Sequence, residues 1–394
     1  MITLLKGELY KFSRSKKNML VFLLTLVFLG GFTVFTIYRE QQYIEQRYEE
    51  LKIDRQIAES QLKLHYFRSK EKNSQEILDE VAFWTKEESL TSSLASHYRF
   101  HEDDMINKIM RWEIDRSENL VIGFQKGYIE SYPFSVEERI TQMQHMIDTN
   151  KYFLDQDKTP MRTPYSLSGL NFLYLLLQDL FPLVFLFIVF LYAIDIYTTD
   201  LENGSYKVVY SLPYHRGKIF TAKLLIILLG STLGIILAIS IYFVGVSMVW
   251  GFGDMQYPVI VFLKKIQEGS NWYVMNTQMN MIKLLGYNVA MFLSLLVFIN
   301  MLILWISVIT DSTSLVVSII IGVFLLSYSI VSFNAFPVIQ DWMIITFYPI
   351  VNQAVELGIQ AITNKVIFVW SIICLLLGHG FWHISRKNFV GGKE

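Results

Sequence analysis

The sequence predicts an all-α membrane protein with six transmembrane helices. Of its 394 residues, 53% are hydrophobic and 18% are charged, which is a more apolar balance than soluble domains usually have. The apolar residues form six stretches of about 20 residues or more, each long enough to cross a bilayer. A polar block of about 130 residues separates the first stretch from the second, so part of the protein is expected outside the membrane.

The predicted spans alternate with polar segments along the chain. They are 19–38, 170–194, 224–250, 284–309, 315–333 and 366–384, of which the last five lie in a membrane region covering 169–394. An even number of spans places both termini on the same side of the membrane. Pro182 predicts a kink in the second span, because proline removes a helical hydrogen bond.

Basic residues gather on one side of these spans. They are Lys6, Lys11, Arg14, Lys16 and Lys17 before the first span, Lys207, Arg216, Lys218 and Lys223 between the second and third, and Arg386, Lys387 and Lys393 at the end of the chain. The positive-inside rule makes that side cytoplasmic, so we expect a multi-pass plasma-membrane protein with both termini in the cytoplasm. Lys264 and Lys265 fall on the other side, although Asp254 and Glu268 accompany them. With a net charge of -1, no nucleic-acid partner is indicated.

Residues 1–18 are predicted to form an amphipathic elbow helix on the cytoplasmic membrane surface. Ile2, Leu5, Leu9 and Phe12 share one helical face, with basic residues between them. A cleaved signal peptide is the alternative. It is disfavoured because the apolar run that follows is about 20 residues long and no small-x-small cleavage site comes after it.

The polar block, residues 39–168, is predicted to be an extracellular helical domain. A stalk helix continues from the first span, with apolar residues at three- and four-residue steps or their multiples: Ile37, Ile44, Tyr48, Leu51, Ala58 and Leu62. Ser135 and Glu138 form a capping box that starts a returning helix. With Cys374 as the single cysteine, no disulfide stabilises the block. Two roles for the block are equally favoured. One is functional, namely gating, cargo binding or partner recognition, and the other is that of a solvated helical spacer.

Residues 334–364 are predicted to form an outer re-entrant hairpin before the sixth span. Pro337, Asp341, Pro349 and Glu356 interrupt an otherwise apolar segment, and such backbone survives at membrane depth only beside protein or a wet cavity. A seventh crossing is the alternative, and it would put the C-terminal basic residues on the wrong side. The candidate substrate path or gate therefore includes Pro337 and Pro349, together with the polar span residues Gln178, Asp179 and Asn300.

Simpler explanations exist for these polar residues. Asp179 is interfacial in the simpler interpretation, and Asn300 bonds across helices. His379 and His383 lie one helical turn apart, but an interfacial pair is favoured over a metal site, because no carboxylate or His-Glu-x-x-His motif accompanies them. No metal site is predicted.

A motif between the second and third spans is the most specific signal in the chain. Glu202, Asn203, Gly204 and Ser205 precede Ser211-Leu212-Pro213, and Arg216, Ile219 and Lys223 follow. Here the sequence resembles the membrane subunit of a type-2 ABC exporter, in which Glu-x-Gly-Thr/Ser, a Ser-x-Pro step and then Arg, Ile and Lys mark the cytoplasmic coupling helix. Ser205 replaces the commoner Thr. The resemblance assigns ATPase coupling to Glu202, Asn203, Gly204, Ser205, Pro213 and Arg216, within a coupling loop at 196–222, and to Lys223 directly after it. Anchoring to anionic lipid heads is the alternative for the basic residues.

The resemblance implies partners for this chain. No Gly-x4-Gly-Lys-Ser/Thr loop occurs, so the chain is not expected to be an enzyme or to carry a cofactor. ATP and Mg are expected in separate ABC ATPase subunits, and a second permease copy or homologue is expected to form a dimer among the membrane lipids. The predicted function is ATP-driven export of an amphipathic peptide, lipid-like or drug-like substrate, as in antimicrobial-peptide export or resistance. A non-transporting membrane sensor or scaffold that uses the extracellular domain to bind a ligand or partner is the alternative.

Overall fold

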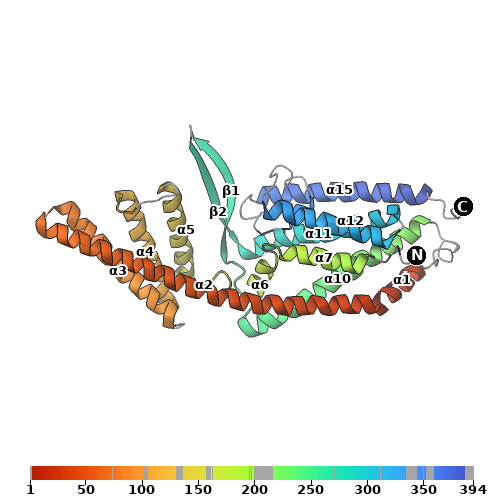
Figure 1. Cartoon of the computed structure of the whole chain (residues 1–394), viewed down its shortest axis with the longest axis horizontal. Coiled ribbons are helices and arrows are strands. Elements are labelled where there is room, and N and C mark those ends of the chain that lie inside the picture. The colour runs from red at the N-terminus through yellow and green to blue at the C-terminus, as the bar shows by residue number, and fades with distance from the viewer. Residues whose placement is uncertain are drawn as a thin grey trace. The chain divides into compact units, whose positions relative to one another are not determined.

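The computed structural model is mostly helical and divides into two compact units (Figure 1). The membrane unit comprises residues 1–33 and 167–394, and the stalk unit comprises residues 34–166. The structure describes residues 2–72, 74–100, 105–129, 136–156, 161, 163–194, 196, 198, 216–268, 271–310, 312–333, 344–348, 350–351 and 359–386.

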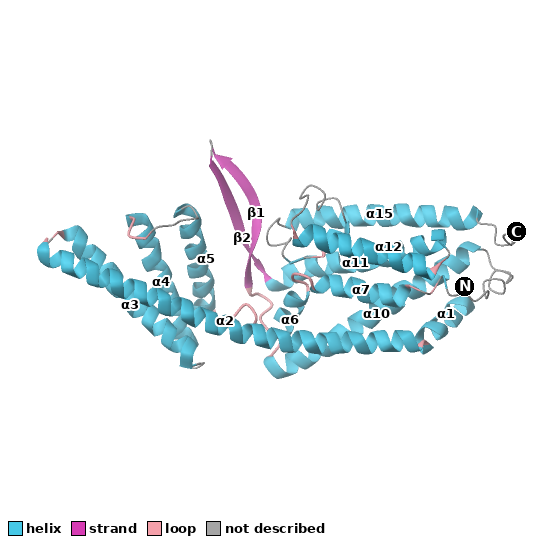
Figure 2. Ribbon diagram, in the orientation of Figure 1, coloured by secondary structure: helices cyan, strands magenta, loops and turns pink. Residues whose placement is uncertain are grey.

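Helices make up most of both units, and one strand pair interrupts the series (Figure 2). The stalk unit contains part of α2 (Lys16–Glu71), followed by α3 (Gln75–Phe100), α4 (Ile106–Lys126) and α5 (Val136–Asp155). The elements that belong to the membrane unit are α1 (Ile2–Arg14), the first part of α2, α6 (Gly169–Leu176), α7 (Phe181–Ala193), α10 (Arg216–Trp250), β1 (Pro258–Glu268), β2 (Asn271–Asn280), α11 (Met281–Thr310), α12 (Thr313–Ser332), the 3-10 helix η2 (Ile344–Phe347) and α15 (Ile359–Arg386).

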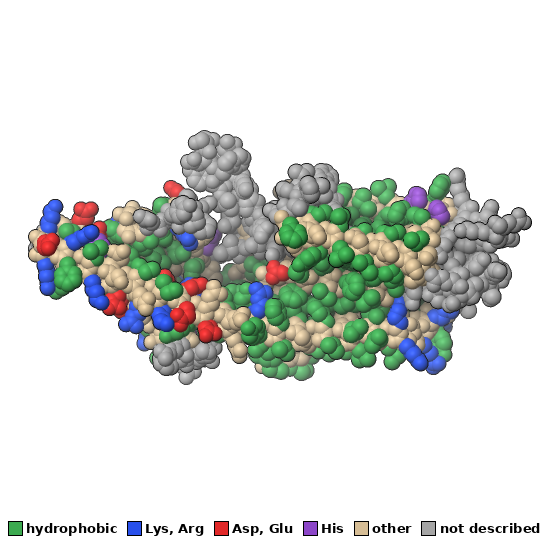
Figure 3. Space-filling model, in the orientation of Figure 1, with side chains coloured by type: hydrophobic (Ala, Val, Ile, Leu, Met, Phe, Trp, Pro, Cys, Tyr) green, Lys and Arg blue, Asp and Glu red, His purple; other side chains and the backbone are tan. Residues whose placement is uncertain are grey.

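The predicted membrane spans are present as helices. Five helices are long and apolar enough to cross a bilayer, and there are six if α6 and α7 count as one span. Helix α11 is the central one: 67% of its apolar window is buried, against 17–33% for the others. Hydrophobic side chains cover much of the visible face of the membrane unit, which suits contact with lipid (Figure 3).

Helices α6 and α7 cover the second predicted span and are separated by a sharp bend just before Pro182. Helices α6 and α7 meet at an angle of 75°, and Pro182 lies in the first turn of α7, where its missing N–H costs no helical hydrogen bond. Ser168 caps α6 by accepting a hydrogen bond from the Asn171 N–H at 3.3 Å. Ser168 thus fixes the start of the helix before the break, and Pro182 lies at the start of the helix after it.

The strand pair is absent from the all-α prediction. Strands β1 and β2 are antiparallel, with Pro258 opposite Asn280 and a bulge between Phe262 and Lys264. From the sequence we predict a loop around Lys264 and Lys265, between the third and fourth spans, and this prediction is wrong. The β-branched and aromatic residues on either side of Gly269-Ser270 are the hairpin signal that this interpretation missed.

The stalk unit builds its core on one face of α2. Ile44, Leu51, Ala58 and His65 recur every seven residues and are all buried. Leu51 packs with residues of α3 and α4, and Ala58 packs with Phe83 and Trp84 of α3. Helix α2 thus continues unbroken from the predicted span into the predicted stalk. The returning helix is α5, which begins at Val136; Ser135 and the Glu138 side chain lie outside the described part.

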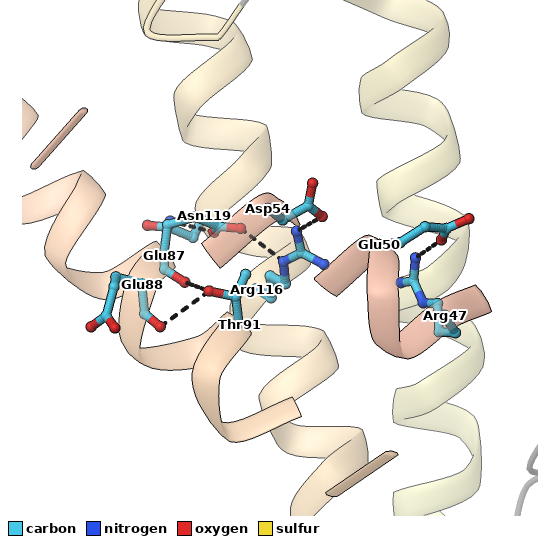
Figure 4. A network of polar contacts seen from close by, with 8 residues as sticks. All are labelled: Arg47, Glu50, Asp54, Glu87, Glu88, Thr91, Arg116 and Asn119. Carbon is cyan, nitrogen blue, oxygen red and sulfur yellow. Dashed lines mark hydrogen bonds and ion pairs between the residues drawn. The ribbon is translucent and has the colours of Figure 1, made fainter. Parts of the chain in front are cut away.

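A buried ionic network joins three helices of the stalk unit (Figure 4). Arg116 of α4 donates to Glu87 of α3 at 2.8 Å and to Asp54 of α2 at 2.6 Å. Asn119 donates a further hydrogen bond to Glu87 at 3.1 Å. Because a buried carboxylate is costly without partners, these bonds compensate for the burial of Glu87.

A second polar cluster surrounds Glu113 in α4. Asn150 of α5 donates to the Glu113 carboxylate at 3.1 Å, and Tyr98 and Arg47 contribute from α3 and α2. Burial raises the pKa of the Glu113 carboxyl, while Asn150 and the two nearby arginines, Arg47 and Arg116, oppose the rise. All four helices of the stalk unit therefore meet at one titratable group.

Candidate coupling end of the membrane unit

The structure describes the two helices that flank the predicted coupling loop. Helix α7 ends at Ala193 and α10 begins at Arg216. Glu202, Asn203, Gly204, Ser205 and Pro213 lie outside the described residues, and only the backbone of Arg216 is described.

Lys223 ties these two helices together. Its side chain is almost fully buried, at 2% exposure, and its Nζ donates to the Ile196 carbonyl at 3.0 Å. A buried ammonium group needs acceptors, and a carbonyl just past the last turn of α7 is free to accept. The contact joins residue 196 to residue 223, which lie on the two sides of the predicted loop. The Lys223 side chain is therefore directed into the interior of the unit.

Helix α1 packs against the same end of the unit. A Cβ added to Gly230 of α10 would lie 2.5 Å from the Phe12 ring, so glycine is what lets α1 approach so closely. Phe12 stacks on Tyr192 of α7, with 5.9 Å between ring centroids. Lys17 donates to the Tyr192 carbonyl at 3.3 Å. The predicted apolar face of residues 1–18 therefore docks on α7 and α10 through Phe12.

Two further contacts complete this end of the unit. The Thr313 hydroxyl at the start of α12 bonds to the Thr198 hydroxyl, beyond α7. Phe220 of α10 meets Phe381 of α15 edge to face at 5.1 Å. The described contacts thus link α1 to α7 and α10, the residues just beyond α7 to α10 and α12, and α10 to α15.

The predicted path residues Gln178 and Asp179 lie in the break between α6 and α7, and both are half-buried. Asp179 has φ of 52°, a left-handed conformation that is uncommon outside glycine, asparagine and aspartate. The Val351 N–H donates to the Leu177 carbonyl at 3.3 Å, so part of the 334–364 segment pairs with the break. Pro337 and Pro349 lie outside the described residues.

Asn300 is buried in α11 and bonds across helices. Its Oδ1 accepts from the Ser231 hydroxyl of α10 at 3.2 Å, and its Nδ2 donates to the Leu296 carbonyl at 2.8 Å. This is the contact expected in the simpler interpretation of Asn300, and it joins α10 to α11 in the interior.

Asn288, also in α11, is a polar span residue that the sequence analysis missed. Its side chain is fully buried, and in the described structure neither its oxygen nor its nitrogen has a hydrogen-bond partner. A signal was available, because Asn288 is an amide inside an apolar run just as Asn300 is. A buried amide without partners destabilises the conformation that buries it.

His379 and His383 lie near each other at the end of α15. Their rings are 6.3 Å apart, and Nδ1 of His379 accepts a hydrogen bond from the Trp305 indole at 2.9 Å. No group of three or more His, Cys, Asp or Glu side chains able to hold a metal occurs among the described residues.

The helices and their apolar surfaces define a multi-pass membrane protein. Residues 2–370 match the family model described as ABC-2 family transporter protein. The chain therefore belongs to this family of ABC transporter permeases, whose members are membrane transport components, are not themselves catalytic and generally work with ABC ATPase subunits. Comparison with curated proteins and with solved structures gives no match.

Proposed function

We propose that this chain is the permease half of an ATP-driven exporter. A separate ATPase subunit, which binds ATP and Mg, moves the loop at 196–222, and a second permease copy or homologue faces this one in the membrane. The observation that carries the proposal is the bond from Lys223 to the Ile196 carbonyl. It joins the chain just beyond α7 to α10 on the two sides of the loop, which supports a joint movement of these two helices.

In this proposal the loop residues divide between two tasks. Glu202, Asn203, Gly204, Ser205, Pro213 and Arg216 contact the ATPase, with Glu202 offering charge-assisted hydrogen bonds. Lys223 holds the ends of the two helices together, so that force on the loop tilts α7 and α10 jointly. Because Phe12 packs on Gly230 of α10, helix α1 follows the same movement.

The cargo path runs beside the broken second span. Gln178, Asp179, Asn300, Pro337 and Pro349 are its proposed residues, and breaks of this kind occur in membranes where backbone lines a pathway. The proposed cargo is an amphipathic peptide, a lipid-like molecule or a drug. The support is compositional: α12 carries no charged residue, and α10 carries none after Lys223.

The proposed orientation puts both termini and the loop in the cytoplasm. The stalk unit is then extracellular, since it follows the first span. The support is the distribution of lysine and arginine, which are concentrated in α1 and at the start of α10.

The test starts from the protein in its native membrane. Affinity purification should recover an ABC ATPase with the chain, and the purified assembly in vesicles should accumulate a fluorescent amphipathic peptide or lipid when ATP is added. Glu202→Ala combined with Gly204→Pro should abolish ATP-dependent uptake and release the ATPase. Gly245→Ala in α10, where nothing lies within 4 Å of the added methyl, is the matched control and should change neither.

Two outcomes contradict the proposal. Recovery of the chain without any ATPase favours the sensor or scaffold. Unchanged uptake in the Glu202→Ala, Gly204→Pro variant removes the loop from coupling.

A further inference from the structure

Helix α2 has a second apolar face in the stalk unit, opposite the one that forms the core. Ile53, Ile57, Leu64 and Phe67 are large apolar residues with exposed fractions of 54%, 49%, 45% and 66%. With exposed Ser60 they follow steps of four, three, four and three residues. This is the spacing of a coiled-coil seam, with Ile57 and Leu64 at a positions and Ile53, Ser60 and Phe67 at d positions. We call these five residues the outer seam.

The stalk unit does not use the outer seam for its own packing. The core of the unit is built on Leu51, Ala58 and His65, which lie on the other side of the same helix. An exposed apolar stripe with regular spacing costs solubility and is typical of a surface that binds another helix.

The charges beside the seam identify the kind of helix that fits. In the same heptad register, Lys63 and Lys70 occupy the g positions of successive heptads, and Arg68 occupies an e position. Asp54, the acidic residue at an e position, is already bonded to Arg116. Within the described structure, no carboxylate forms an ion pair with Arg68 or Lys70, whereas Lys63 pairs with Glu59 at 2.7 Å. The flanks of the seam are therefore basic.

The basic flanks argue against a second copy of this chain as the occupant. In a parallel pair of identical stalks, Lys63 at g would face Arg68 at e of the other copy, and like charges there are unfavourable. A helix with glutamate or aspartate at its own e and g positions meets the basic flanks with opposite charge. We propose that the outer seam binds an amphipathic helix of another protein, with an apolar seam and acidic flanks.

Binding of designed peptides to the full chain in zwitterionic lipid nanodiscs tests this proposal. The probe is a labelled helical peptide of about four heptads, with isoleucine at a, leucine at d and glutamate at e and g. Its partner probe has lysine at e and g. Fluorescence anisotropy, with empty nanodiscs subtracted, should give a Kd for the glutamate peptide on the order of tenfold lower than for the lysine peptide.

Variants of the seam separate charge from apolar contact. Lys63→Glu, Arg68→Glu and Lys70→Glu together should reverse the preference between the peptides. Ile57→Asn with Leu64→Asn should weaken the binding of the glutamate peptide on the order of tenfold or more. Leu78→Asn, at an exposed apolar residue of α3 that lies outside the seam, is the matched control and should leave binding unchanged. All these side chains are exposed, so the fold is retained, and circular dichroism checks this.

Three results would overturn the proposal. Equal binding of the two peptides, or of neither, removes the charge recognition. Retention of the original preference in the triple glutamate variant places binding elsewhere. A change in the mass of the assembly from dimer to monomer with Ile57→Asn and Leu64→Asn, without loss of peptide binding, makes the seam a contact between copies of this chain.

Discussion

Arg116 and Glu87 form a buried ion pair in the stalk unit, with 2.8 Å between the arginine Nε and the glutamate Oε1. Both residues are at most 9% exposed, and Asp54 and Asn119 provide further bonds. Removing one partner of such a pair leaves an uncompensated charge in the interior, which is far more costly than the loss of a surface pair.

The first prediction follows from this contrast. Arg116→Met should lower the free energy of unfolding of the stalk unit by about 3–5 kcal/mol, because the Glu87 carboxylate loses its charged partner. Arg55→Met breaks the partly exposed pair of Arg55 with Glu88, at 3.2 Å, and should cost less than about 1 kcal/mol. Hydrogen exchange of the α3 and α4 amides in nanodiscs measures both. Equal losses in the two variants would contradict the role of burial.

The second prediction concerns pH. Burial raises the pKa of Glu113 above its ordinary value of 4.5, so the folded state holds this proton to higher pH than the unfolded state does. The free energy of unfolding should therefore decrease as pH rises from 4.5 through the raised pKa, and then stay level. Glu113→Gln should remove this decrease. Thermal unfolding of the full chain at a series of pH values measures it.

A matched variant controls for general effects of charge on the pH dependence. Glu118→Gln removes a carboxylate of the same helix that pairs at the surface with Lys151 at 3.2 Å. The decrease with pH should persist in this variant. If Glu113→Gln keeps the decrease as well, then another group is responsible for it.

The third prediction tests the docking of α1. Gly230→Ala should destabilise the membrane unit by about 1–3 kcal/mol, because the new methyl group displaces the Phe12 ring. Gly245→Ala in the same helix meets no atom within 4 Å and should stabilise by up to about 1 kcal/mol. Thermal unfolding of the detergent-purified chain measures the two variants, and hydrogen exchange of α1 should rise only in the first. Unchanged exchange in α1 would show that Phe12 does not hold the helix.

The fourth prediction contrasts two buried asparagines of α11. Asn288→Leu should stabilise the membrane unit by about 1–3 kcal/mol, because it removes an amide without partners. Asn300→Leu should destabilise by roughly 0.5–1.5 kcal/mol, because it breaks the bond with Ser231. Thermal midpoints should therefore move in opposite directions. A shift of both in the same direction would mean that side-chain volume, not hydrogen bonding, decides.

Much of the fold could be predicted from the sequence, because the bilayer imposes a simple rule of length and polarity. The spans, the kink at Pro182 and the continuation of α2 beyond Tyr38 all follow from apolar runs, proline chemistry and helical spacing. The hairpin of β1 and β2 was missed, since its strands combine apolar, basic and amide residues and lack the length signal of a span.

The candidate site was harder to predict, because its contacts join residues that are distant in sequence. The motif identified Lys223 by spacing, but spacing does not reveal that the side chain turns inward to Ile196. The packing of Phe12 against Gly230 is equally invisible, since it depends on how two helices cross. Family resemblance predicts the coupling loop, which stays a prediction, and the structure adds the bond between the two helices that flank it.

The bond from Lys223 to Ile196 also separates two kinds of evolutionary change. Under the proposed function, insertions, deletions or exchanges of sequence between these anchor points are expected to alter what the loop recognises while the bond between the two flanking helices is kept. If the proposed coupling holds, the segment serves as a replaceable adapter, and one transmembrane scaffold could be matched to different motor proteins while its lipid-facing architecture stays the same.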